Sequence, residues 1–170
     1  MTSTYEKIAT NTLGSAAASV TFSSISGAYT DLVVIASIKQ SATDTLLLRY
    51  GNGTLDTGTN YSITVLKGNG STASSTRAST ISSIYADYEA YAPSAASTFA
   101  PDIYQIMNYS NTTTYKTTLA RANNAGVGVD AIVGLWRSTS AINILEFRYT
   151  GGTTISSGST FTIYGILKAA

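Results

Sequence analysis

The chain has 170 residues and a formal net charge of +1; only 11% of its residues are charged, whereas 44% are hydrophobic. It contains no His and no Cys, and its nine Asp and Glu are outnumbered by 23 Ser and 27 Thr. These absences exclude Ser–His and Cys–His nucleophiles, disulfides and thiolate metal sites. The ten Lys and Arg stand singly rather than in a basic stripe, so we expect no nucleic-acid partner.

A chain of this length suits one hydrophobic core, and we predict a single domain over residues 1–170. Its apolar residues are spread from end to end, which favours folding over disorder. The first residues, MTSTYEKIATNTLG, show neither a basic region nor an apolar stretch typical of a signal peptide, and no run approaches ~18 apolar residues. We therefore expect no secretion signal and no membrane span, and synthesis in the host cytoplasm.

Short apolar or alternating segments recur between turn clusters of Gly, Ser, Asn and Thr, a pattern typical of an all-β, antiparallel β-sandwich. The predicted strands, in chain order, are Tyr5–Ala9, Ser19–Ser23, Leu32–Lys39, Leu46–Tyr50, Ser62–Leu66, Thr80–Tyr85, Ile103–Tyr109, Lys116–Arg121, Ala131–Arg137, Asn143–Tyr149 and Thr160–Leu167.

Two kinds of strand are distinguished by their periodicity. In Ser19–Ser23 and in Thr160–Leu167 apolar and polar residues alternate, which predicts one buried face. Leu32–Ile35 and Leu46–Leu48 are continuously apolar, which predicts burial on both faces, one of them against a neighbouring subunit. Pro101, in the polar connection after Pro93, is predicted to lie just before a strand, where no ladder donor is lost.

The segment Ile81–Ala92 admits two interpretations. Its apolar residues fit the spacing of a short amphipathic helix, whereas its Tyr content and the Ser and Thr before it favour a strand followed by a loop. We favour the strand.

Paired carboxylates are the remaining residues that could support hydrolysis. Asp87 and Glu89 would share a face of an extended segment, and Asp56 follows a Gly-Asn-Gly turn. The dense oxygen ligands of a calcium loop are missing. We interpret the three carboxylates as solvated surface and expect no catalytic residue, no metal site and no cofactor.

Ring-bearing side chains are the strongest binding signal, because amphipathic rings stack on sugars or anchor protein interfaces. Tyr85, Tyr88 and Tyr91 are the candidate exposed aromatics, as subunit contacts or ligand contacts, while Trp136 is assigned to the core. Five Asn-X-Ser/Thr triplets are interpreted as turn chemistry rather than glycan acceptors; they begin at Asn52, Asn60, Asn69, Asn108 and Asn111.

A set of segments carries one further signal. It comprises Ser19–Ile25, Tyr29–Leu32, Leu48–Asn52, Asp56–Ser62, Gly68–Ser71, Ile106–Thr112, Tyr115–Thr117, Trp136–Ile142 and Gly158–Ile166. Together these resemble a family of small β-rich virion structural proteins of tailed bacteriophages, over most of the chain and least between Ile81 and Phe99. Tyr50 is followed here by an extra Gly51, which we expect to alter the geometry of the next loop.

The resemblance implies a phage structural component with a jelly-roll-like sandwich that works as a symmetric oligomer. We expect a capsid decoration (cement) protein, a trimer located in the virion and bound to the major capsid protein or another virion protein. The alternative is a head- or tail-fibre, receptor-binding protein that recognises host surface carbohydrate through exposed tyrosines. A depolymerase would require Asp56, Asp87 or Glu89 to converge in a cleft.

Overall fold

The computed structural model describes residues 4–89, 91–93 and 98–167, and these contain no helix. The chain is built from strands joined by turns and loops, thirteen of them within the described residues. Their bounds are β1 Tyr5–Thr12, β2 Ser19–Phe22, β3 Asp31–Ile38, β4 Leu46–Asn52, β5 Thr54–Leu55, β6 Tyr61–Gly68, β7 Ala73–Ile81, β8 Ile84–Asp87, β9 Ala100–Met107, β10 Lys116–Asn124, β11 Gly128–Trp136, β12 Ile144–Arg148 and β13 Thr160–Ile166.

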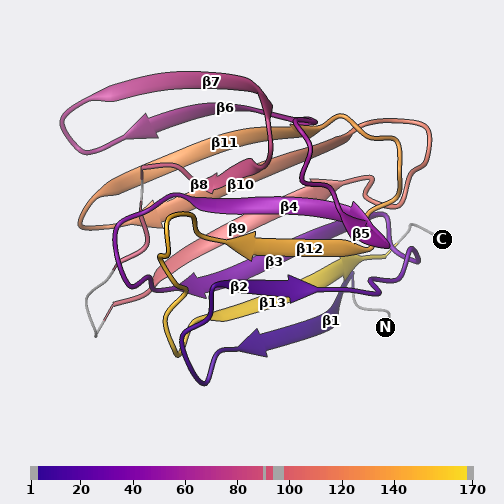
Figure 1. Cartoon of the computed structure of the whole chain (residues 1–170), viewed down its shortest axis with the longest axis horizontal. Coiled ribbons are helices and arrows are strands. Elements are labelled where there is room, and N and C mark those ends of the chain that lie inside the picture. The colour runs from indigo at the N-terminus through magenta and orange to yellow at the C-terminus, as the bar shows by residue number, and fades with distance from the viewer. Residues whose placement is uncertain (1–3, 90, 94–97, 168–170) are drawn as a thin grey trace.

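The strands form two antiparallel sheets (Figure 1). The larger has eight strands in the order β1-β13-β3-β9-β10-β11-β6-β7. The smaller has five strands, with β2-β12-β4-β5 in order and β8 paired to β4. The smaller sheet lies in front of the larger one in Figure 1, and buried side chains from both form one hydrophobic cluster. The predicted all-β antiparallel class is confirmed, and the two layers are consistent with a β-sandwich.

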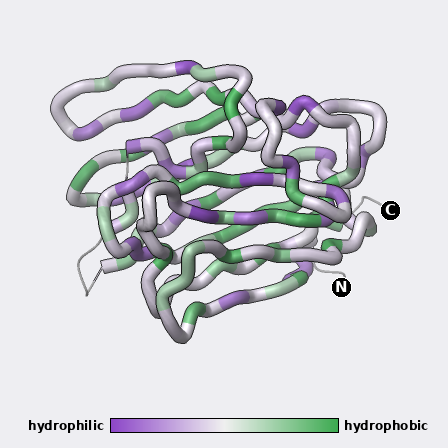
Figure 2. The backbone as a smooth tube through the Cα atoms, in the orientation of Figure 1, coloured by the Kyte–Doolittle hydropathy of each residue, from purple (hydrophilic) through white to green (hydrophobic). Residues whose placement is uncertain are grey.

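Buried and exposed side chains alternate along β2 and β13, as their sequences predicted. Val20 and Phe22 on β2 are buried, as are Phe161 and Ile163 on β13, while their polar neighbours point outward. Figure 2 shows the same alternation of green and paler residues along many strands. Because side chains on a strand point alternately to its two faces, these residues set which face meets the core.

Aromatic rings join the two sheets at two places. Phe147 on β12 packs between Tyr104 and Phe161 of the larger sheet, with ring centroids 4.9 and 5.0 Å apart. Tyr50 on β4 similarly contacts Tyr61 and Trp136, with centroids 6.4 and 5.8 Å away. Trp136 is only 2% exposed, which confirms its assignment to the core.

The two continuously apolar segments differ in how far they are buried. Leu46, Leu47 and Leu48 are all buried, as predicted, although residues of the same chain cover them and no neighbouring subunit is needed. On β3, Ile35 is 45% exposed, so the prediction of burial on both faces is wrong there. The smaller sheet covers only the inner face of β3, and the described residues place nothing over Ile35.

The region around Ile81 also differs from the prediction. The predicted strand Thr80–Tyr85 is divided between β7, which ends at Ile81, and β8, which starts at Ile84. A bulge causes the break, because Thr80 has a φ of 59° and the register with β6 shifts between Tyr61 and Ser62. The helical alternative for Ile81–Ala92 is wrong, since the first part of that segment is strand β8.

Two further strands and one proline differ from the prediction. The short β5 and most of β7, which carries mainly Ser, Thr and Ala, lack the apolar periodicity that marks a buried strand. Pro101 lies inside β9 rather than before it, where it pairs with Ser37 of β3. Pairing with β10 starts only at Ile103, so the missing N–H of Pro101 costs no ladder bond on that side.

Gly51 is required by close approach of the backbone. A Cβ placed on it would lie 2.1 Å from the carbonyl oxygen of Thr54 in β5. We therefore predict that Gly51→Ala lowers the free energy of unfolding by about 1–3 kcal/mol through overpacking. Gly14→Ala is the matched control, because its Cβ would meet no atom within 4 Å; its effect should stay within about 0.5 kcal/mol. Urea unfolding of both variants measures the difference, and equal stabilities would contradict the requirement.

Candidate functional site

Two of the three predicted aromatic residues form a stacked pair. The rings of Tyr85 and Tyr88 lie parallel, with an interplanar angle of 2° and centroids 5.5 Å apart. The Lys67 ammonium lies 5.0 Å from the Tyr88 ring centroid and pairs with Glu89. Both tyrosines are half-buried rather than fully exposed. Because a ring and a cation already contact Tyr88, Tyr85 is the member with more of its ring face available.

The stacked pair borders a hollow with a volume of about 570 Å³. Asp44 and Thr150 form its far wall, where the Asp44 carboxylate accepts hydrogen bonds from the Thr150 hydroxyl at 2.9 Å and the Thr150 amide at 3.1 Å. The bulged Thr80 lines the same hollow. The structure therefore brings together an aromatic pair, a carboxylate and several hydroxyls.

Tyr91 lies apart from this pair. It lines a second hollow of about 260 Å³, together with Lys67, Glu89 and Asp130. The Tyr91 carbonyl accepts a hydrogen bond of 2.6 Å from the Asn124 side chain. The three tyrosines predicted as one candidate group thus divide between two hollows.

The three candidate carboxylates do not converge. Asp56 lies beside Trp136 in a hollow next to β5, Glu89 lines the hollow of Tyr91, and Asp87 is 1% exposed. The interpretation of Asp87 as solvated surface is wrong, because β8 turns its side chain into the space between the sheets.

Asp56 has a structural environment that holds it ionised. Its carboxylate accepts hydrogen bonds from the Trp136 indole at 2.7 Å, the Asn60 amide at 2.8 Å and the Gly58 N–H at 2.8 Å. Partial burial opposes ionisation, but these donors outweigh it and lower the pKa of Asp56. The carboxylate thereby anchors the loop after β5 to the buried Trp136.

Buried carboxylates form an unexpected cluster in the interior. Asp87, Asp102 and Asp130 are each 1% exposed. Burial, with the charge of Asp102 as the next cause, raises the pKa of Asp87 to about 8. Burial also raises the pKa of Asp102 to about 7, although the Asn123 N–H and the Tyr104 hydroxyl bind its carboxylate.

One oxygen in this cluster lacks a donor. Asp87 Oδ2 accepts the Ala92 N–H at 3.0 Å, whereas Asp87 Oδ1 is buried without a hydrogen-bond partner in the part of the chain that the structure describes. The nearby Tyr149 hydroxyl is also buried without a hydrogen-bond partner in the described residues. Burial is the main cause that raises the pKa of Tyr149, and the charge of Asp87 is the next. A buried oxygen without donors favours the neutral acid, which agrees with the raised pKa of Asp87.

The Asn-rich turns act as the sequence predicted. Asn69 Oδ1 accepts the N–H groups of Ser71 and Thr72, and Asn111 Oδ1 accepts those of Thr113 and Thr114. Each side chain closes its own turn, so turn geometry accounts for these two asparagines.

The outward side of the larger sheet carries a set of exposed aliphatic side chains, interspersed with polar ones, which we call the outer aliphatic face. Leu119 pairs directly with Val133, whereas Leu66 pairs with Ala131 and Met107 pairs with Thr117. Its members are between 39% and 59% exposed; they are Ile35, Leu66, Met107, Leu119, Val129 and Val133.

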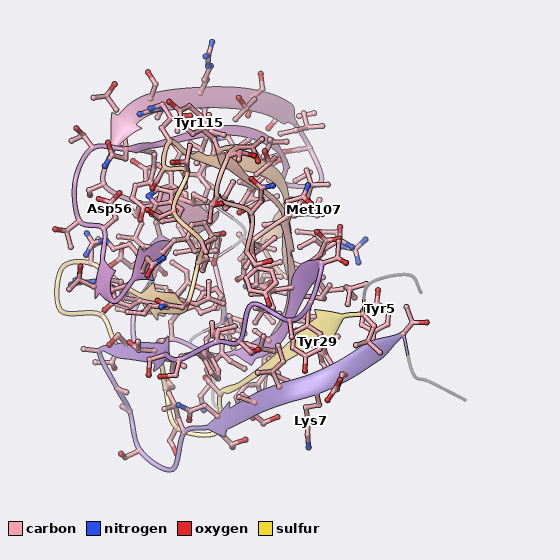
Figure 3. The ribbon with its side chains drawn as sticks, turned by 90° about the vertical axis from the view of Figure 1, so that its right-hand side faces the viewer. Tyr5, Lys7, Tyr29, Asp56, Met107 and Tyr115 are labelled. Atoms are coloured by element: carbon pink, nitrogen blue, oxygen red, sulfur yellow. The ribbon has the colours of Figure 1, made fainter. Side chains whose placement is uncertain are left out.

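Figure 3 views the end of the molecule that borders this face. Tyr5, Tyr29 and Met107 lie on the side of the larger sheet, and Asp56 lies on the opposite side (Figure 3). Tyr5 and Tyr115 are each more than half exposed. Lys7 points away from the body below β1 (Figure 3).

The described residues bring no three His, Cys, Asp or Glu side chains into an arrangement that could hold a metal ion. Within the same residues, no helix is long and apolar enough to cross a membrane. No protein-family model matches the sequence, and no curated protein matches it.

Sequence reasoning missed two parts of these surfaces. Asp44 and Thr150 are 106 positions apart, and no local motif marks either of them. The outer aliphatic face is distributed over five strands, and its exposure could be recognised only once the sheet order was known.

The buried carboxylates predict a pH dependence of stability. A carboxyl whose folded pKa is raised stabilises the fold fully below its unfolded pKa of about 3.9, and this contribution is lost as pH rises through the folded value. We therefore expect the free energy of unfolding to fall between about pH 4 and the pKa of Asp87, about 8. Asp87→Asn should reduce this slope, leaving the part due to Asp102, whose pKa is raised to about 7, and should stabilise the protein at pH 8. Urea unfolding across this pH range measures both effects.

Asp56→Asn provides a control of opposite sign. Because its folded pKa is lowered, Asp56 stabilises the fold above its unfolded pKa, and that stability is lost only as pH falls through the folded value. Its replacement should therefore destabilise the protein at neutral pH. A wild-type profile that is flat from pH 4 to 8 would contradict the raised pKa of Asp87.

Proposed function

We propose that the chain is a non-catalytic structural protein of a phage virion, most specifically a capsid decoration protein that reinforces the head lattice. It would work as a symmetric oligomer, a trimer, bound to the major capsid protein. A jelly-roll-like topology, implied by the resemblance of the sequence to small virion proteins, belongs to this proposal.

The observation that carries the proposal is the outer aliphatic face. Exposed aliphatic side chains gathered on one side of a sheet are a candidate interaction site. The outward side chains of β9, β10, β11, β6 and β7 also include Arg77 and Arg121 but no carboxylate, whereas β3 begins with Asp31 on the side of Ile35. A second copy of the same face would bring cations together, so charge complementarity favours a different protein surface that carries carboxylates.

A standard interface buries about 800 Å² on each partner, roughly a tenth of a small protein's surface. The chain exposes 8059 Å² in total, and the face spans the central strands of its larger sheet. In this proposal the outer aliphatic face binds the capsid, and a separate surface joins the copies of the chain to one another. Each oligomer would then link neighbouring capsid proteins.

The alternative function, a head- or tail-fibre protein that recognises host surface carbohydrate, is favoured by a different observation. The stacked Tyr85 and Tyr88 border a hollow of about 570 Å³, and aromatic rings are common sugar platforms. The two functions differ in where the protein sits on the particle. Decoration requires it across the head lattice, in proportion to the capsid protein, whereas a fibre would be present in few copies at the tail or portal.

A comparison of variants tests the decoration proposal. Val133→Glu places a charge at the centre of the outer aliphatic face, and we expect it to weaken binding to heads assembled without this chain by about tenfold or more. Val127→Glu is the matched control, because Val127 is similarly exposed but lies in the turn between β10 and β11. Sedimentation of labelled protein with purified heads measures both.

Both variants should unfold like the wild type, since exposed substitutions cost within about 0.5 kcal/mol. Virion reconstruction provides the second readout, with density expected across the head lattice. Density at the tail alone, or failure of the wild-type protein to bind heads, would overturn the decoration role.

A further inference from the structure

We propose that the hollow between β4, β8 and the Asp44–Thr150 contact is a binding site for a neutral saccharide. This site goes beyond the decoration role and does not depend on it, since the hollow lies on the side of the smaller sheet and includes no residue of the outer aliphatic face.

The volume and lining of the hollow match a small polar ligand. Its volume of about 570 Å³ lies within the range of ordinary small-molecule sites. Six of its eleven lining residues are Ser or Thr, whose hydroxyls both donate and accept hydrogen bonds. A ligand that is itself covered with hydroxyls is the chemical complement of such a wall.

An aromatic platform borders the same space. The parallel stack of Tyr88 under Tyr85 holds the Tyr85 ring in place, and Lys67 further restrains Tyr88. A fixed ring loses little conformational entropy when the apolar C–H face of a sugar packs against it. The buried Leu47 adds apolar contact in the same hollow.

Asp44 provides the charged acceptor of the site. Its carboxylate receives three donors from the chain, the Thr45 N–H at 2.7 Å and the N–H and hydroxyl of Thr150. A carboxylate has about four acceptor positions, so one is left for a ligand hydroxyl. The hydrogen bonds within the chain fix the orientation of Asp44 before any ligand arrives.

Ser83 gives independent support. It lines the hollow, is 2% exposed, and its hydroxyl makes no hydrogen bond to another residue in the described part of the chain. The Ser83 oxygen is not one of the fully buried, unpartnered atoms of the described residues, so solvent reaches it from the hollow, and a ligand hydroxyl would take the place of water there.

The charge of the site selects the class of saccharide. Among the residues that the structure describes, Asp44 is the only charged one that lines the hollow, and the Lys67 ammonium is engaged by Glu89 outside it. A carboxylate-bearing sugar such as sialic acid would be repelled by Asp44 and would meet no cation there. Neutral hexoses and N-acetylhexosamines are therefore the expected ligands.

A glycan array with neutral and sialylated oligosaccharides, probed with the labelled full chain, tests the site. We expect saturable binding to neutral glycans, and the best of these is then titrated by calorimetry. Tyr85→Ala should weaken its affinity by about tenfold or more. Tyr115→Ala is the matched control, because Tyr115 is an exposed tyrosine that does not line the hollow, and it should bind as the wild type does.

Ser83→Ala guards against a folding defect, since it removes only an unpartnered hydroxyl and leaves the tyrosine stack intact. It should also weaken binding, with an unchanged thermal midpoint. The site is overturned if no neutral glycan binds saturably, if only sialylated glycans bind, or if Tyr85→Ala and Ser83→Ala bind as tightly as the wild type. Each of these outcomes leaves the decoration role untouched, because that role is measured on heads.

Discussion

The packing of aromatic rings between two antiparallel sheets is the constraint on which the rest of the structure depends. Phe147 of the smaller sheet is held between Tyr104 and Phe161 of the larger one, and Tyr50 is held against Tyr61 and Trp136. These rings bury large apolar areas and fix the distance and register of the sheets. Turns and loops at both ends are arranged around that fixed separation.

Tyrosine and tryptophan bring polar atoms into the core, and those atoms need partners. Tyr50 bonds to Thr118, Tyr104 to Asp102, and Trp136 to Asp56. This demand accounts for the burial of Asp102, whereas Asp87 accepts the Ala92 N–H instead. Asp87 and Asp102 share the interior, where burial raises both pKa values toward neutrality. These two buried carboxylates couple stability to pH.

The two sheets differ in width, and this difference leaves surfaces for function. Eight strands lie against five, and the outward side of the larger sheet remains uncovered by the described residues (Figure 1). Exposed aliphatic side chains there suit a protein partner, whereas the hydroxyl-lined hollow beside Tyr85 suits a small polar ligand. The two surfaces involve different strands, so the two proposed roles do not compete for the same residues.

Local patterns in the sequence determined the β class, the positions of most strands and the core role of Trp136. Alternation in Ser19–Phe22 and Thr160–Ile166 needs only the two-residue period of a strand, and the turns at Asn69 and Asn111 need only their own side chains. Strand β7 was missed because its exposed Ser and Thr carry no apolar period.

Only the tertiary structure decided which surfaces stayed free and which charges were buried. Ile35 was predicted to be buried but is exposed, and Asp87 was predicted to be exposed but is buried. Both outcomes depend on which strands lie opposite in the other sheet, and no local pattern records that. The contact between Asp44 and Thr150 joins residues 106 positions apart for the same reason. Periodicity determines the faces of each strand, whereas the pairing of distant strands decides what covers those faces.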